Sequence, residues 1–119
     1  KPNNCCERGL LMKGLRIKEF IKYVGENSKK HGFREREIPA AEFIALIHSE
    51  VLEVLEELRK GKSPTETYYS ENGKPEGVPS ELADAVIRCF DMADYYGIDL
   101  INQDHINTTK NFDKISILS

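Results

Sequence analysis

Apolar residues recur at helical spacing along the first half of the chain and predict two amphipathic helices. In the first, from Leu15 to about His31, they alternate with lysines and glutamates in the three- and four-residue steps of a helix. The second pattern, from Ala40 to Lys60, is the strongest in the sequence, and Gly61 ends it. Its apolar stripe consists of Ile44, Ile47, Val51, Val54, Leu55 and Leu58.

A third helix is predicted from Glu81 to about Tyr96, with Ser80 as its N-cap and Gly97 as its terminator. Apolar residues cover most of its circumference, which predicts a central, buried helix. Asp99 is expected to cap a shorter fourth helix that runs towards Lys114.

The segment between the second and third helices, residues 62–79, contains Ser-Pro and Asn-Gly turn signals. We interpret it as a loop, because no alternation of apolar and polar residues indicates a strand, and loops of this length in small domains are often functional. The predicted fold is therefore all-α, with one domain over residues 15–119. Residues 1–14 are expected to be a tail, either disordered or an upstream addition, with Met12 as a candidate natural start.

The composition is that of a globular chain that does not bind membranes or nucleic acids. Of the 119 residues, 39% are hydrophobic and 31% are charged, and no apolar run approaches the ~20 residues that a membrane-spanning helix needs. A net charge of −3 disfavours non-specific nucleic-acid binding. The three cysteines lack the spacing of a zinc site or of a disulfide framework, which favours a reducing cytoplasm.

Two pairs of carboxylates carry the candidate chemistry. Glu50 and Glu53 lie three residues apart on the second predicted helix, and Glu81 and Asp84 repeat this spacing on the third. Each pair therefore shares one face of its helix. If helix packing encloses these groups, a cation must offset their repulsion, and Mg²⁺, or Mn²⁺ in its place, is a hard ion that binds carboxylate and phosphate oxygens. The pattern by itself fits a surface network of carboxylates equally well.

The sequence around these carboxylates resembles the MazG-like family of nucleotide pyrophosphohydrolases, over roughly residues 15–114. The similar segments are Gly32-Phe33-Arg34-Glu35, Leu46-Ile47-His48-Ser49-Glu50-Val51-Leu52-Glu53, Glu56-Glu57-Leu58-Arg59-Lys60-Gly61, Glu81-Leu82-Ala83-Asp84-Ala85-Val86-Ile87-Arg88 and Gly97-Ile98-Asp99-Leu100. The resemblance implies a bundle of four main helices, completed by assembly into a homodimer or homotetramer. It also implies that a nucleoside triphosphate is split into monophosphate and pyrophosphate. The groups that would bind Mg²⁺ and act in catalysis are Glu50, Glu53, Glu81 and Asp84.

Five further residues are candidates for substrate binding: Phe33, Lys62, Arg88, Asn111 and Lys114. Phe33 matches a family position for an aromatic residue near the base, although from the residue alone it could equally be part of the core. Asn111 matches a family asparagine in the last helix, although it could equally lie on the surface. The chain departs from the family at Asn107, where relatives usually have a lysine for the phosphates, and at Lys110, which is often aromatic. These departures put phosphate binding by the last helix in question.

Two other functions compete with hydrolysis. A non-catalytic module for protein association could use the same bundle, although the two intact carboxylate pairs favour an enzyme. A redox metal site is disfavoured, because His31, His48 and His105 lack metal-ligand spacing. Nucleophilic catalysis by Ser49 or Ser80 is unsupported, since neither has an evident base.

Overall fold

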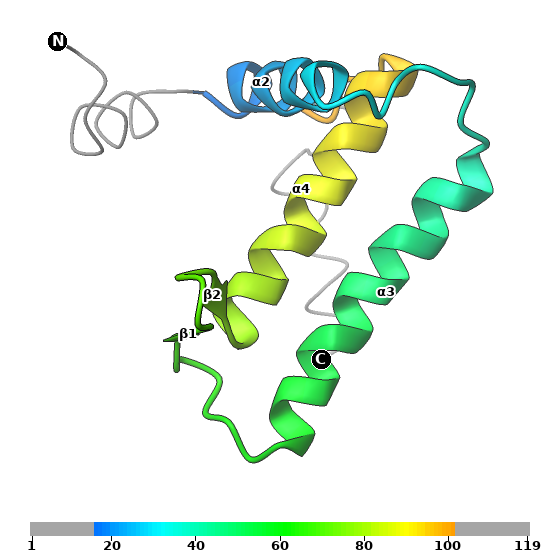
Figure 1. Ribbon diagram of the computed structural model, residues 1–119. Coiled ribbons are helices and arrows are strands. Elements are labelled where there is room, and N and C mark those ends of the chain that lie inside the picture. Colours follow the sequence, from blue (N-terminus) through cyan, green and yellow to red (C-terminus); the bar gives the residue numbers. More distant parts are fainter. Residues whose placement is uncertain (1–15, 102–119) are drawn as a thin grey trace, which may run out of the picture.

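The computed structural model describes residues 16–101 and shows a helical fold with one small hairpin (Figure 1). Its elements are α2 (Ile17–Lys30), α3 (Ala40–Arg59), β1 (Tyr68–Tyr69), β2 (Pro75–Glu76) and α4 (Val78–Tyr96). Helices α3 and α4 lie side by side and run in opposite directions, and α2 crosses α4 near its C-terminal end. The three helices predicted over this part of the chain are confirmed. The expected tail at 1–14 and the fourth helix towards Lys114 fall outside the described residues.

The two ends of α4 show which sequence signals decide a helix boundary. Gly97 adopts a left-handed conformation, with φ 66°, and ends the helix as predicted. The predicted start is wrong, because Gly77 is the N-cap and Ser80 lies inside the first turn. Pro79 explains the earlier start, since the first turn of a helix does not need the N–H that proline lacks. The Ser80 hydroxyl instead donates a hydrogen bond to the Pro75 carbonyl oxygen at 3.2 Å.

The segment predicted as an irregular loop contains a short antiparallel hairpin. Strands β1 and β2 pair in a register that places Tyr68 opposite Glu76. A 2.9 Å hydrogen bond from the Ser70 N–H to the Lys74 carbonyl oxygen closes the turn. Each strand has two residues, which is too short for an alternation of apolar and polar positions to be visible, so the sequence pattern missed them.

Gly77 joins this hairpin to α4 at a place where no other residue fits without strain. Its φ of 113° is one that other residues rarely adopt, and a β-carbon there would lie 2.5 Å from the carbonyl oxygen of Glu66. The close backbone approach fixes the hairpin against the segment that precedes it.

The connection between α2 and α3, residues 31–39, is attached to the C-terminal end of α4. The Ile38 N–H donates to the Tyr95 hydroxyl at 2.9 Å, and the Tyr96 hydroxyl donates to the Ile38 carbonyl oxygen at 2.9 Å. Arg34 also forms ion pairs with Asp91 at 2.6 Å and with Asp94 at 3.3 Å. Polar contacts therefore hold the connection at this end of the fold.

The apolar core is thin, and no residue of the predicted stripe of α3 is fully buried in it. Phe43 and Glu57 are buried on this helix, whereas Val51, Leu55 and Leu58 are exposed. Four of the six residues of the predicted stripe are thus exposed in the described chain, with Ile44 the fourth, and only Ile47 and Val54 are half-buried. The buried apolar side chains are Ile21, Val24, Ile38, Phe43, Val78, Ala85 and Ala93.

Helix α4 is central, as predicted, because it contacts α2, α3 and β2. The prediction that this helix is buried is wrong for part of its apolar surface in the described chain, since Leu82, Val86 and Ile87 are exposed. Two helices and a hairpin cannot cover the whole circumference of a third helix. No helix between residues 16 and 101 combines the length and the apolar character needed to cross a membrane.

Candidate functional site

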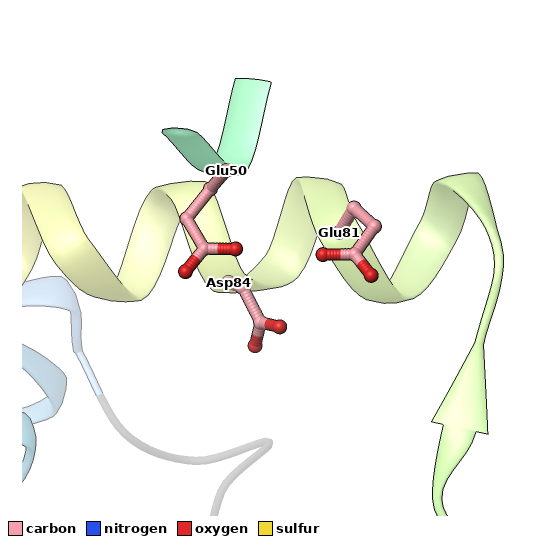
Figure 2. Close-up of side chains that lie close together, drawn as sticks. All are labelled: Glu50, Glu81 and Asp84. Atoms are coloured by element: carbon pink, nitrogen blue, oxygen red, sulfur yellow. The ribbon is translucent and has the colours of Figure 1, made fainter. Parts of the chain in front are cut away.

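Three of the four predicted carboxylates meet where α3 faces α4. Glu50 extends from α3 towards Glu81 and Asp84, which lie one turn apart on α4 (Figure 2). One carboxylate oxygen from each of the three residues lies within 4.8 Å of the others. The three-residue spacing on α4 thus places two carboxylates on the helix face that meets Glu50. We call these three residues the carboxylate cluster.

The carboxylate cluster is poorly compensated by its surroundings. Glu81 is only 9% exposed, and neither its carboxylate nor that of Asp84 accepts a hydrogen bond from residues 16–101. Burial raises the pKa of Glu81 above its ordinary value, and the negative charges of Asp84, Glu50 and Glu53 raise it further. Burial and the Glu50 charge likewise raise the pKa of Asp84. The protein alone therefore disfavours the full negative charge of this cluster, and a bound cation would favour it.

Glu53 is separated from the cluster by its position on α3. It is exposed and does not belong to the group of three, although it lines the same cavity and its charge contributes to the raised pKa of Glu81. The structure thus brings together three members of the predicted four-residue set and leaves the fourth on the rim.

Arg88 provides one positive charge at the cluster. Its Nε donates a hydrogen bond to Oε1 of Glu50 at 3.1 Å, so this ion pair links α4 to α3. Its charge also lowers the pKa of Asp84, against the larger effect of burial. Arg88 therefore neutralises part of the cluster from one side only.

The carboxylate cluster lines an open cavity of about 1170 Å³ that is bordered by all three helices. Phe33, the predicted base-binding residue, contributes to this lining from the α2–α3 connection. Phe33 is 64% exposed, and its ring is stacked on that of His31, with 6.2 Å between the ring centroids. Within the described chain Phe33 is therefore not a core residue, and the structure places it on the same cavity as the carboxylates.

Of the two lysines in the hairpin region, the structure places Lys74 on the cavity and not Lys62, the one predicted from the sequence. Lys62 does not line the cavity, because its ammonium group lies 4.2 Å from the centre of the Tyr68 ring and 3.9 Å from Glu66. Lys74, which the sequence reasoning did not select, does line it, and its charge lowers the pKa values of Glu81 and Asp84. The Asn-Gly turn signal just before Lys74 was the only hint in the sequence. The other predicted substrate-binding residues, Asn111 and Lys114, and the divergent positions Asn107 and Lys110, lie outside the described residues.

A second group of carboxylates, Glu57, Glu76 and Glu81, lies at the hairpin end of α4. Glu57 is buried, but it accepts a 2.8 Å hydrogen bond from the Tyr68 hydroxyl and a 3.1 Å ion pair from Lys60. The Tyr68 hydrogen bond and the charge of Lys60 hold its pKa below the ordinary value despite burial. Because Glu57 is already compensated, its role is to anchor the hairpin on α3.

Comparison of this chain with protein-family models, with curated proteins and with solved structures finds no match. The family suggested by the sequence motifs therefore stays a prediction.

Proposed function

We propose that this chain is a magnesium-dependent nucleotide pyrophosphohydrolase of the MazG-like type. It would hydrolyse a nucleoside or deoxynucleoside triphosphate between the α- and β-phosphates, as an enzyme that removes unwanted nucleotides from the cytoplasmic pool. The observation that carries the proposal is the carboxylate cluster on an open cavity, with no compensating donor at Glu81 or Asp84 in the described chain. The sequence motifs that surround these residues support the same activity.

The residues of the cluster fit a hard divalent cation. Glu50, Glu81 and Asp84 offer carboxylate oxygens close enough together to share one ion. Because Glu81 is buried, a bound cation would stabilise its carboxylate in the charged form. When bound, Mg²⁺, or Mn²⁺ in its place, would neutralise phosphate charge and lower the pKa of a water molecule. The set proposed for the ion is the three residues of the cluster together with Glu53.

The chain's own groups account for the remaining requirements of the reaction. Water would attack the α-phosphorus, and the bond from that phosphorus to the oxygen that bridges to the β-phosphorus would break, releasing pyrophosphate. Glu53, on the rim of the cavity, would orient the water and accept its proton. Phe33 offers an exposed aromatic face on which a base can stack, and Arg88 offers a guanidinium group to a phosphate.

The test is a panel of canonical and modified nucleoside triphosphates, assayed with magnesium for monophosphate and pyrophosphate. At least one substrate should give these two products. The variant Glu81→Gln should be inactive, whereas Glu26→Gln, an exposed residue of α2 outside the cavity, should retain the activity of the parent protein. Diphosphate and orthophosphate as products would refute the proposed bond cleavage.

A second candidate function rests on the exposed apolar residues of α3 and α4. Val51, Leu55, Leu82 and Val86 are each between 40% and 52% exposed, which is unusual for so many apolar residues on two adjacent helices. They support assembly into a homodimer or homotetramer, and they would equally serve a non-catalytic association module. Self-association without hydrolysis of any nucleotide in the panel would favour the module.

A further inference from the structure

Lys74 lines the cavity because the turn of the hairpin places it there. The residue follows the turn at Gly73, which has a φ of 81°, and its carbonyl oxygen accepts the hydrogen bond from Ser70 that closes the turn. Its backbone N–H donates to the Ser70 hydroxyl at 3.2 Å. These contacts direct the chain back towards α4 and place Lys74 on the lining shared with Glu81 and Asp84.

The hairpin that carries Lys74 is anchored at its base. The Tyr68 hydroxyl donates to the buried carboxylate of Glu57 at 2.8 Å, and the ammonium group of Lys62 lies over the Tyr68 ring. Gly77 permits the close backbone approach at the other end of the hairpin. Lys74 is therefore presented by a fixed element, although its own side chain is 68% exposed.

Among the cationic residues that line the cavity in the described chain, Lys74 has the weakest acidic partner. Arg36 is paired with Glu42 and Arg88 with Glu50. The nearest carboxylate oxygen to Lys74 belongs to Glu76, at 4.0 Å, which is the outer limit of an ion pair. The ammonium group of Lys74 is thus available for a ligand.

A polyphosphate that approaches the carboxylate cluster meets mostly negative charge. A triphosphate remains anionic after it binds one divalent cation, so the site needs a further positive group beyond the metal. Arg88 is partly neutralised by Glu50, which leaves Lys74 on the hairpin side of the cluster.

We propose that Lys74 is a phosphate-binding residue that contacts the phosphates departing as pyrophosphate. The inference rests on the proposed function. It adds a phosphate-binding residue and an orientation of the substrate, whose pyrophosphate end would lie towards the hairpin. The hairpin would then be part of the binding site and would supply a positive charge to the phosphates.

The experiment measures the affinity of the full chain for pyrophosphate in magnesium by calorimetry, and in parallel kcat and KM for the best nucleotide. Lys74→Ala should weaken pyrophosphate binding about 10- to 100-fold, as expected for the loss of one charged hydrogen bond. Lys74→Arg should restore most of the affinity. Lys22→Ala, which removes the same charge from an exposed position of α2 outside the cavity, should bind like the parent protein.

A second variant separates ligand contact from a structural effect. Tyr68→Phe removes the hydroxyl that anchors the hairpin on Glu57, so it should also weaken pyrophosphate binding. If the anchor acts by positioning Lys74, the double variant Tyr68→Phe/Lys74→Ala should bind no worse than Lys74→Ala. The melting temperature of Lys74→Ala should stay close to that of the parent protein, because the side chain is exposed.

The outcomes distinguish the inference from the function on which it rests. A parent protein that hydrolyses nucleotides, with unchanged pyrophosphate affinity in Lys74→Ala, overturns the role of Lys74 and leaves the function intact. A parent protein that binds pyrophosphate through Lys74 but hydrolyses no nucleotide overturns the function instead. If the parent protein does not bind pyrophosphate at all, the role of Lys74 is also overturned.

Discussion

Arg88 on α4 donates a hydrogen bond to Glu50 on α3 over 3.1 Å, and this contact places a positive charge beside a carboxylate that we propose as a metal ligand. The guanidinium side chain is 40% exposed and that of Glu50 is 14% exposed. The pair therefore contributes little to stability by itself, and its main effect is on the charge balance of the carboxylate cluster.

Replacing Arg88 with glutamine should make the cluster more dependent on a cation. In a chelator the variant should lose up to about 1 kcal/mol of unfolding free energy, because the repulsion among the carboxylates is no longer offset. Magnesium should then stabilise the variant more than it stabilises the parent protein. Thermal melting over a magnesium titration measures both effects, and an equal response of the two proteins would count against a cation at this cluster.

The substitution Asp84→Ala separates a metal site from a structural network. For a metal site, removal of one charge should leave the metal-free protein equally stable or more stable, while kcat falls by about 100-fold or more. Magnesium at about 100 times its dissociation constant should stabilise the parent by about 2.7 kcal/mol and the variant hardly at all. For a structural role, destabilisation of about 1 to 3 kcal/mol should appear in both buffers. Melting curves in magnesium and in chelator, with activity measured in parallel, decide between these results.

The raised pKa values of Glu81 and Asp84 predict the pH dependence of the metal-free protein. The folded state holds protons on these groups more tightly than the unfolded chain does, so it binds more protons between their ordinary pKa values, about 4, and their raised ones. Their contribution to stability should therefore be fully present below the ordinary values and be lost as the pH rises through the raised ones. Glu57 acts with the opposite sign, because its pKa is lowered and its contribution is lost as the pH falls through that lowered value.

Urea unfolding in chelator between pH 4 and pH 8 tests this dependence. The double variant Glu81→Gln/Asp84→Asn removes both raised groups and leaves Glu57 in place, so the difference between its profile and that of the parent isolates the cluster. The parent should lose stability relative to the variant as the pH rises. If the unfolding free energies of the two proteins change in parallel with pH, the folded state does not raise the pKa values of Glu81 and Asp84.

Gly77→Ala tests the close approach that fixes the hairpin. The new β-carbon would meet the Glu66 carbonyl oxygen at 2.5 Å, and the backbone would be held at a φ of 113°. We expect a loss of about 1 to 3 kcal/mol in the unfolding free energy. Gly73→Ala is the matched control, since it carries a comparable positive φ of 81° but has no atom within 4 Å of the added carbon. Equal losses in the two variants would mean that the contact with Glu66 has no effect beyond backbone strain.

The exposed apolar side chains predict at least a dimer in solution. Leu55→Lys and Val86→Lys would each place a charge among these side chains, and either should lower the molecular mass measured by sedimentation at tens of micromolar, on the scale of weak association. Lys22→Ala serves as a control outside this surface. A parent protein that sediments only as a monomer would contradict the prediction.

The sequence was sufficient to predict the three helices between residues 16 and 101, because each carries a long apolar periodicity and because Gly61 and Gly97 mark the ends of α3 and α4. Glu81 and Asp84 could be placed on one helix face from their spacing alone. The meeting of that face with Glu50 depends on how α3 packs. The fully buried residues of α3, Phe43 and Glu57, lie outside the predicted apolar stripe, most of which is exposed. Helical spacing reports that a stripe exists and does not report which partner covers it.

The position of Lys74 near the carboxylate cluster could not be predicted from the sequence for a similar reason. Lys62 and Lys74 lie in one segment, and the direction in which each side chain is presented depends on a hairpin whose strands have two residues each. The Tyr68 ring holds Lys62 away from the cavity, and the turn at Gly73 brings Lys74 to it. Contacts between residues of the loop itself decide which of the two lysines reaches the cavity, and such contacts leave no periodic signal in the sequence.

The hydroxyl groups of Tyr95 and Tyr96 satisfy both backbone polar groups of Ile38, so the α2–α3 connection behaves as an extension of α4. A loop held in this way cannot open on its own, because opening would leave the N–H and the carbonyl oxygen of a buried residue unpaired. Opening of the connection and fraying of the last turn of α4 should therefore form one cooperative unit. Phe33 belongs to the same connection, so the backbone that presents it to a ligand would open no more often than the last turn of α4 does.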